Sequence, residues 1–158
     1  MPSPIAVVAV LVGVLLSVLW ATRMQMSPMF SRTVRGRNLL TGNEKEFYGR
    51  LKRALSSNYE VMPQVAMAAL METTLPEGHP HYWESRKLFS QKIVDFLVCT
   101  KGTLDIVAVI ELDDITHDAA KDARRDELML MAGIRTVRWH SRRKPTVEQI
   151  RQAIEALT

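Results

Sequence analysis

The sequence predicts an α/β domain in which a mixed β-sheet is flanked by helices, with one apolar helix ahead of it. Three observations support this fold class. Several segments repeat apolar residues at helical spacing, four shorter apolar runs have strand length, and residues 5–21 are apolar without a single charge. The chain has 158 residues, 47% of them hydrophobic, which is sufficient for one domain with a packed core. Its single cysteine, Cys99, excludes an intrachain disulfide and fits a reducing compartment.

The N-terminal run IAVVAVLVGVLLSVLWA, residues 5–21, predicts a single-pass membrane helix. At about 1.5 Å per residue, a helix of this length crosses the hydrocarbon core of a bilayer with little tilt. Trp20 stands where an aromatic anchor is expected. Basic residues follow the run and none precedes it, so the positive-inside rule predicts an inner-membrane protein with its N-terminus outside and its C-terminal part in the cytoplasm. A cleaved signal peptide is the alternative, but the uncharged start MPSP and the exit LWATRMQM speak against it.

We therefore divide the chain into a transmembrane anchor (1–22), a basic juxtamembrane linker (23–38) and a folded domain (39–158). The formal net charge is +4, and the remainder of the chain is balanced once the four arginines at 23, 32, 35 and 37 are set aside. A strongly basic nucleic-acid-binding domain is thereby excluded, although a local basic patch is not. The linker arginines are placed to contact anionic lipid headgroups.

The folded domain begins with a predicted helix within residues 41–57, where apolar residues recur at helical spacing and Thr41 or Asn43 provides the N-cap. A strand follows at 59–65. Its Pro63 predicts an edge strand or a bend, because proline cannot donate to a central ladder.

The middle of the domain predicts a loop, a hairpin and a helix. Residues 72–85 are rich in turn formers. Strands at 92–99 and 104–112 are joined through the turn sequence TKG, so they are expected to pair antiparallel. A helix at 118–132 then ends at Gly133, which is a natural C-cap.

A strand at 134–140 and a helix at 146–157, capped by Thr146, complete the domain. The predicted order is helix, strand, strand, strand, helix, strand, helix. This order predicts a mixed sheet covered by helices.

Three carboxylates interrupt or close the apolar strands, where their desolvation is costly. Asp95 lies within IVDFLVC, and Glu111 and Asp113 close IVAVIELDD. Because side chains alternate along a strand, Glu111 and Asp113 share a face, and an in-register hairpin places Asp95 beside Glu111. Clustered carboxylates are relieved by a proton or a cation, and Mg²⁺ prefers such oxygen ligands. The alternative is that Asp95 pairs with Lys92 or an arginine, while Asp113 begins a solvated turn.

The stretches KIVDFLVC, VIELDDITH, DARRD and AGIRTVR together resemble the bacterial domain of unknown function 2726. That family resembles the PD-(D/E)XK superfamily, which has the restriction-endonuclease-like fold with an α-β-β-β-α-β core, and it is similar to endonucleases of very-short-patch repair. The resemblance extends from about Leu39 to Trp139. Each motif is weak alone and fairly specific in combination.

The resemblance implies roles for the matching positions. Asp95 would be the aspartate of the PD element and Glu111 the first acid of the (D/E)XK element. Glu44 or Glu46 would match the acid that many relatives place on the first helix. Gln64 would match a polar position on the first strand.

One departure from the superfamily pattern concerns the lysine two residues after the glutamate, because this chain has Asp113 there. Lysine would orient water and stabilise negative charge on a phosphate, which aspartate does not do. Asp113 is instead a candidate third metal ligand beside Asp95 and Glu111. His117 is the best candidate for a general base or a metal ligand. Lys92 or Lys121 would supply the missing positive charge.

The helix that follows has Asp122, Arg125, Asp126 and Met129 on one face. Asp122 and Arg125 at this spacing also suit a plain surface ion pair of little energetic value. The resemblance favours a face that abuts the carboxylates, with Asp122 and Asp126 in support and Arg125 meeting phosphate.

A basic stretch, RTVRWHSRRK, provides Arg138, Arg142 and Arg143 as candidate phosphate contacts, with a solvated strand end as the alternative. Trp139 suits core packing better than stacking on a base. His79 and His81 have no partner at zinc-like spacing, which indicates a loop.

These observations predict a membrane-tethered, metal-dependent nuclease with Mg²⁺ or Mn²⁺ as cofactor and nucleic acid, DNA or RNA, as partner. Two alternatives stay open. One is a non-catalytic nucleic-acid-binding module of the same fold, and the other is a membrane-bound protein-interaction domain.

Overall fold

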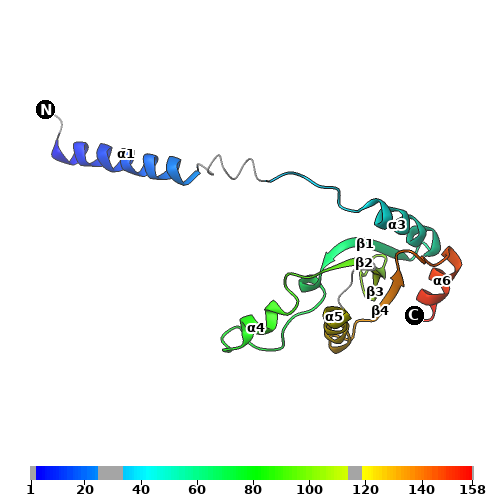
Figure 1. Cartoon of the computed structure of the whole chain (residues 1–158). Helices are drawn as coiled ribbons and strands as arrows, with labels where there is room; N and C mark the ends of the chain where they lie inside the picture. Colours follow the sequence, from blue (N-terminus) through cyan, green and yellow to red (C-terminus); the bar gives the residue numbers. More distant parts are fainter. Residues whose placement is uncertain (1–2, 25–33, 114–118, 158) are drawn as a thin grey trace. The chain divides into compact units, whose positions relative to one another are not determined.

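The computed structural model describes residues 3–24, 34–113 and 119–157. These residues form two compact units, Met1–Asn38 and Leu39–Thr158. The folded unit contains every strand that the structure describes (Figure 1).

In the described part of the N-terminal unit, helix α1 spans Pro4–Met24. Its described large apolar side chains are exposed; for example, the exposed fraction is 80% for Ile5 and 66% for Trp20. The side chains of Pro4, Ala9 and residues 21–24 are outside the description. Among the described residues, no helix reaches the length and apolarity needed to cross a membrane.

The folded unit alternates helices and strands along the chain. In order, its elements are α3 (Gly42–Ala54), β1 (Tyr59–Ala66), the 3₁₀ helix η1 (Met67–Ala69), α4 (Tyr82–Lys87), β2 (Ile93–Thr100), β3 (Ile106–Asp113), α5 (Ala119–Met131), β4 (Thr136–His140) and α6 (Val147–Glu155). The predicted mixed sheet flanked by helices is confirmed. The short helix α4 is the main addition, since it falls partly within the segment predicted as a loop.

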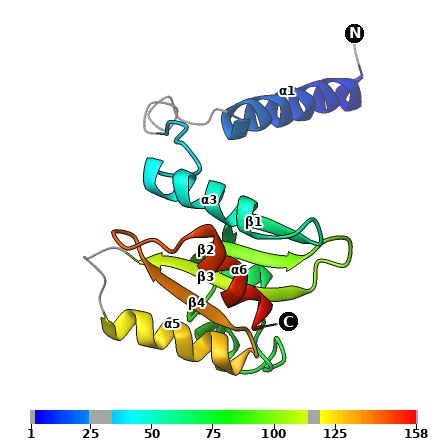
Figure 2. The same cartoon turned by 90° about the vertical axis from the view of Figure 1, so that its right-hand side faces the viewer.

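The four strands form one sheet in the order β1-β2-β3-β4. β1 pairs with β2 and β2 with β3 in antiparallel fashion, whereas β3 pairs with β4 in parallel. β1 is thus an edge strand, as its Pro63 predicts. The parallel pair requires a crossover, and α5 provides it (Figure 2).

Local signals fix the helix ends. The Thr41 hydroxyl accepts from the Glu44 backbone N–H while the Glu44 carboxylate accepts from the Thr41 N–H, which is a capping box at α3. Thr146 forms the same motif with Gln149 at α6. At the end of α5, Gly133 adopts φ +70° and begins a Schellman motif.

The hairpin between β2 and β3 is longer than the predicted TKG turn. β3 begins at Ile106 and not at Leu104, because Leu104 adopts a left-handed φ of 60°. The Thr103 hydroxyl donates to Asp105 and the Asp105 N–H donates to the Thr100 hydroxyl, which closes the wider loop.

Each face of the sheet is covered by its own apolar cluster. On one face α3 and α6 pack through Phe47, Leu51, Ile150 and Ile154 against strand residues such as Phe96 and Ile110. On the other face Met129 of α5 packs with Met67, Phe89, Leu97 and Val109. The second cluster is the smaller one, and it shares its face with the polar groups described next.

Candidate functional site

Asp95 on β2 and Glu111 on β3 lie on neighbouring strands and on the same face of the sheet. The ladder pairs Phe96 with Ile110, so the next residues along these antiparallel strands, Asp95 and Glu111, stand opposite each other. The Leu112 backbone N–H donates a 2.9 Å hydrogen bond to Asp95 Oδ2. The register therefore brings two carboxyl groups together inside the sheet, on the face covered by α5.

Burial makes both of these carboxyl groups reluctant to ionise. Glu111 is 2% exposed. Burial, and then the negative charge of Asp95, raise the pKa of Glu111 to about 7, although the Arg125 guanidinium opposes the shift. Burial likewise raises the pKa of Asp95, with the charge of Glu44 acting in the same direction.

The two carboxyl groups act on each other's ionisation. Burial raises the pKa of Asp95 overall, while a side-chain hydrogen bond with Glu111 acts in the opposite direction. Two neighbouring carboxylates in a desolvated site cannot both be charged unless a cation joins them. The pair therefore offers a defined place for one proton or one cation.

Arg125 of α5 is the charged partner of Glu111. Its Nη1 lies 3.0 Å from Glu111 Oε1, and its side chain is 24% exposed. The helix face predicted to abut the carboxylates thus does so. The alternative partner, Asp122, lies on α5, but its side chain is outside the described residues.

Arg138 of β4 joins the sheet to α5. Its Nη1 lies 2.7 Å from Asp113 Oδ1, and its Nη2 lies 2.7 Å from Asp126 Oδ1. Burial disfavours the charge of the guanidinium, yet the hydrogen bonds of Asp126 and the charge of Asp113 raise the pKa of Arg138 above its ordinary value. Arg138 was predicted to contact phosphate, and the structure instead commits its guanidinium to two internal carboxylates.

Glu44 and Gln64 approach the pair from α3 and β1. Gln64 Nε2 donates to Glu44 Oε1 at 3.2 Å, and the charge of Glu44 reaches Asp95. Gln64 adopts φ +55°, in the left-handed region that glycine favours. The ladder pairs Pro63 with Phe96 and Val65 with Val94, so Gln64 stands opposite Asp95 without ladder pairing. The strained residue therefore lies at the carboxylate pair.

Glu46, the other candidate acid on α3, serves a different contact. It lies 2.6 Å from Lys144 Nζ and 2.6 Å from Arg50 Nε, and these hydrogen bonds lower its pKa. Of the two candidates, Glu44 is the one whose charge acts on Asp95.

The remaining predicted residues make no described contact with the carboxylate pair. His117 lies outside the described residues, and Lys121 belongs to α5 with its side chain outside the description. Lys92 is half-buried just before β2, and in the described part of the chain it makes no ion pair with Asp95. Arg142 and Arg143 are exposed beyond β4. The predicted basic patch is consequently reduced, because Arg138 and Lys144 are engaged internally.

The structure also places Trp139 and the two histidines His79 and His81. Trp139 packs edge-on against Phe47, with ring centroids 5.8 Å apart, and so belongs to the core. His79 and His81 lie in the segment before α4, where His81 Nδ1 is 2.8 Å from Glu84.

The donor set at the pair suits a divalent cation of the Mg²⁺ type. Over residues 3–24, 34–113 and 119–157, no group of three or more histidine, cysteine or acidic side chains is arranged to hold a metal ion. Mg²⁺, however, commonly takes one or two protein carboxylates and fills its shell with water and substrate phosphates. Asp95 and Glu111 supply two hard oxygen donors, and a cation would take the place of their proton. Asp113, the predicted third ligand, does not complete a three-residue group with them.

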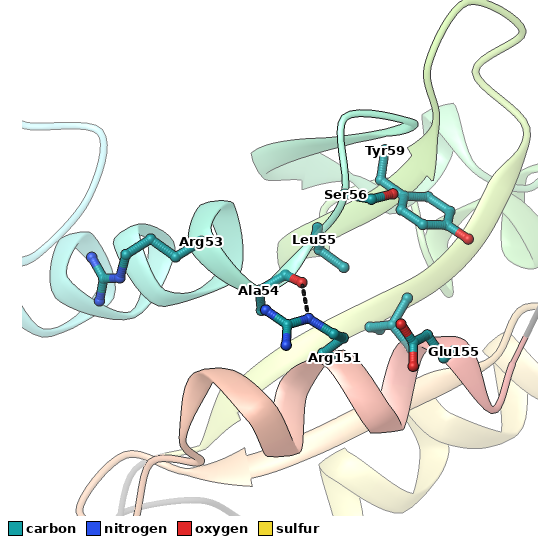
Figure 3. A pocket seen from close by; sticks show the side chains of 8 residues that line it. Arg53, Ala54, Leu55, Ser56, Tyr59, Arg151 and Glu155 are labelled. Carbon is teal, nitrogen blue, oxygen red and sulfur yellow. Dashed lines mark hydrogen bonds between the residues drawn. The ribbon is translucent and has the colours of Figure 1, made fainter.

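A pocket of about 160 Å³ lies away from this pair, between the end of α3 and α6 (Figure 3). Arg151 Nε donates to the Ala54 carbonyl oxygen across it, at 3.3 Å. Figure 3 shows Arg53 pointing away from Arg151. None of the predicted site residues lines this pocket.

A second pocket, of about 410 Å³, lies on the α5 side and is lined in part by Lys92. It also contains Lys87 and Arg124, which the sequence interpretation missed. Lys87 lies close to the segment predicted as a loop. Arg124 lies outside the face of the predicted helix that contains Asp122 and Asp126.

Comparison with known proteins places most of the chain in one family. Residues 36–157 match the family model described as Protein of unknown function (DUF2726). No curated protein and no solved structure matches significantly.

We expect the free energy of unfolding to fall as the pH rises from about 5 to about 8 in metal-free buffer. Folded Glu111 has a pKa of about 7 against an ordinary value of 4.5, so the folded state binds more protons between these values. This contribution is fully present below about pH 4.5 and is lost as the pH rises through about 7. At 1.36 kcal/mol per pKa unit it amounts to at most about 3 kcal/mol. Chemical denaturation at several pH values measures it.

Glu111→Gln is the matched control, because its amide stays neutral over the same range. The difference in unfolding free energy between wild type and this variant should therefore change with pH. Parallel profiles would show that Glu111 does not carry the raised pKa.

We also expect Gln64→Gly to be more stable than Gln64→Ala by about 1 kcal/mol. Both variants lose the hydrogen bond to Glu44, but only alanine keeps the cost of a Cβ at φ +55°. In an ordinary strand position the order is the reverse. Urea unfolding of the two variants measures the difference, and alanine being the more stable would contradict a left-handed Gln64.

Proposed function

The chain belongs to the DUF2726 family of proteins of unknown function, and from its own site we propose that it is a metal-dependent phosphodiesterase acting on DNA or RNA. The observation that carries the proposal is the buried pairing of Asp95 with Glu111 across β2 and β3. Two neighbouring buried carboxyl groups are suited to exchange a proton for a divalent cation.

The order of elements supports this proposal at the level of fold. α3, β1, β2, β3, α5 and β4 follow the α-β-β-β-α-β order of the restriction-endonuclease-like core. In that core the two acids lie on the second and third strands, as Asp95 and Glu111 do here. The agreement is one of order and placement, and it makes the nuclease superfamily the best source of a mechanism.

In the proposed reaction, Asp95 and Glu111 hold Mg²⁺ or Mn²⁺. When bound, the cation polarises a phosphoryl oxygen and lowers the pKa of a water molecule. Glu111 gives up its proton on binding, so its raised pKa makes cation affinity increase with pH. His117, six residues further along the chain, is the proposed base for the attacking water.

Arg125 takes the role that the superfamily gives to the lysine of its motif. The lysine position is occupied by Asp113, which lies 2.7 Å from Arg138. Arg125 approaches the same carboxylate from α5, with Nη1 3.0 Å from Glu111. Once a cation neutralises Glu111, the guanidinium is free to donate to a non-bridging phosphate oxygen.

A second candidate function is a non-catalytic nucleic-acid-binding module of the same fold. The ion pair between Arg125 and Glu111 favours it, because an arginine already compensates the buried carboxylate without any metal. Such a module would bind nucleic acid with or without divalent ions.

We further propose that residues 5–21 attach the chain to the inner membrane, with the folded unit in the cytoplasm. The support is the charge-free sequence, the exposed apolar side chains of α1 and the arginines that follow it. Attachment would confine the activity to nucleic acid near the membrane.

We expect the full chain, purified in a mild detergent, to cleave nucleic acid with Mg²⁺ or Mn²⁺ and not with EDTA. Glu111→Gln and Asp95→Asn should each lower the rate by at least about 100-fold, because stabilisation by a bound cation amounts to several kcal/mol. Labelled single-stranded and double-stranded DNA and RNA, resolved on denaturing gels, measure cleavage.

Glu77→Gln is the matched control for cleavage, since it makes the same carboxylate-to-amide change at an exposed side chain of the same domain. Binding that is independent of metal, with no cleavage of any substrate, would favour the non-catalytic module. Cleavage that survives both carboxylate variants would place the active site elsewhere.

We expect the full chain to fractionate with bacterial membranes and to resist alkaline carbonate extraction. Val12→Arg should release it, because a central charge costs about 2.5–3.5 kcal/mol on insertion. Val34→Arg, the same change in the linker, should leave it membrane-bound. Equal fractionation of both variants would count against attachment through residues 5–21.

A further inference from the structure

A pocket of about 410 Å³ lies between the end of α4 and α5. Arg124, Leu128 and Met131 line it from one face of α5. Lys87, at the end of α4, and Lys92, just before β2, line it from the other side. Both helices lie on the same side of the sheet (Figure 1). The pocket therefore shares α5, and the start of β2, with the carboxylate pair.

The cations of this pocket have no internal partner among the residues that the structure describes. Within the described residues, Lys87, Lys92 and Arg124 have no side-chain hydrogen bond or ion pair. This sets them apart from Arg125 and Arg138, whose guanidinium groups are paired with buried or half-buried carboxylates. Three positive charges face one acid, Glu127, in the pocket, so its occupant is expected to be an anion.

The pocket also has an apolar wall. Leu88 is 41% exposed and Met131 is 78% exposed, and Leu128 completes the wall from α5. An aliphatic wall beside cations that have no partner in the described part of the chain suits a ligand with an anionic group next to an apolar surface. Nucleotides of an unpaired strand present both, a phosphate and a base face.

We propose that this pocket holds a phosphate and the adjoining base of a single nucleic-acid strand whose neighbouring phosphate reaches Asp95 and Glu111. The proposal rests on the proposed function and specifies its substrate as a strand that is unpaired at this point. α5 connects the two places, because consecutive residues serve them: Arg124 lines the pocket and Arg125 contacts Glu111. Along the helix, Met131 lies about 9 Å from Arg125, at about 1.5 Å per residue.

The test uses the full chain in detergent and a fluorescent single-stranded DNA oligonucleotide without metal, so that binding is measured apart from cleavage. The variant Lys87→Gln/Arg124→Gln should lower affinity by at least about 10-fold and reduce the slope of log affinity against log salt by about 1.4, or about 0.7 for each lost phosphate contact. Lys45→Gln/Arg53→Gln is the control. It removes two exposed charges from α3, on the opposite face of the sheet, and should leave affinity and slope unchanged.

Met131→Ser tests the apolar wall. It should weaken binding of the ordinary oligonucleotide by about 5-fold or more and leave an abasic oligonucleotide unaffected, because the abasic strand keeps the phosphates and lacks the base. Thermal unfolding should stay within about 2 °C of wild type for every variant, since the altered side chains are exposed and unpaired.

The outcomes separate this proposal from the proposed function. If the pocket variant binds the oligonucleotide as tightly as the control variant does, the pocket assignment is overturned even when cleavage depends on Glu111. If the pocket variant loses binding but no variant or wild type cleaves, the pocket stands and the catalytic proposal fails. Loss of binding to anionic short-chain lipid with unchanged oligonucleotide affinity would assign the pocket to a lipid headgroup and overturn the inference.

Discussion

The burial of Glu111 beside Asp95 is the constraint on which the rest of this face depends. A carboxyl group that is 2% exposed and stands opposite a second carboxyl group can ionise only if positive charge is brought to it. The Arg125 guanidinium brings part of that charge to Glu111, and the Leu112 N–H donates to the neighbouring Asp95. The structure thereby keeps two acids at a place where apolar side chains of the same volume would cost less free energy to bury.

The same constraint explains how α5 is held against the sheet. The apolar cluster under α5 is smaller than the one beneath α3 and α6, and Met129 is its one fully buried residue from α5 among those described. Polar contacts supplement it: Arg125 ties the helix to β3, and Arg138 ties Asp126 of the helix to β4 and Asp113 of β3. The position of the helix and the charge state of the site are therefore coupled. A change in the protonation or ligation of Glu111 acts directly on the contact that positions α5.

The sequence predicted the framework well because its signals are local. Thr41, Thr146 and Gly133 mark helix ends by short-range hydrogen bonding, and the alternation of apolar residues fixed which faces of β2 and β3 are buried. The opposition of Asp95 and Glu111 followed from that alternation and a hairpin. The partner of each charge did not follow. Whether Arg138 meets a phosphate or Asp126 depends on the crossover of α5, which no local pattern encodes.

Two further features could not be predicted from the sequence, because they too depend on contacts between distant parts of the chain. The left-handed φ of Gln64 occurs at a residue with no intrinsic preference for it, and its side chain contacts Glu44 on a distant helix, so no local pattern predicts it. The pocket between the end of α4 and α5 could not be predicted without α4, and the six residues of α4 are too few for periodicity to identify a helix. Local propensity thus accounts for the scaffold, and long-range packing accounts for the chemistry placed on it.

Arg125 decides how the buried pair can be used. An arginine supplies one positive charge and five donors but cannot activate water, whereas a divalent cation supplies two charges and ligates both carboxylates. At low pH a proton on Glu111 weakens the hold of either cation, because protonated Glu111 attracts neither strongly. Near and above pH 7 the ionised pair carries two negative charges, which one arginine compensates only in part. In the proposed function, this uncompensated charge would draw a divalent cation into the site, and its arrival would free Arg125 for a phosphate while Arg138 keeps α5 in place.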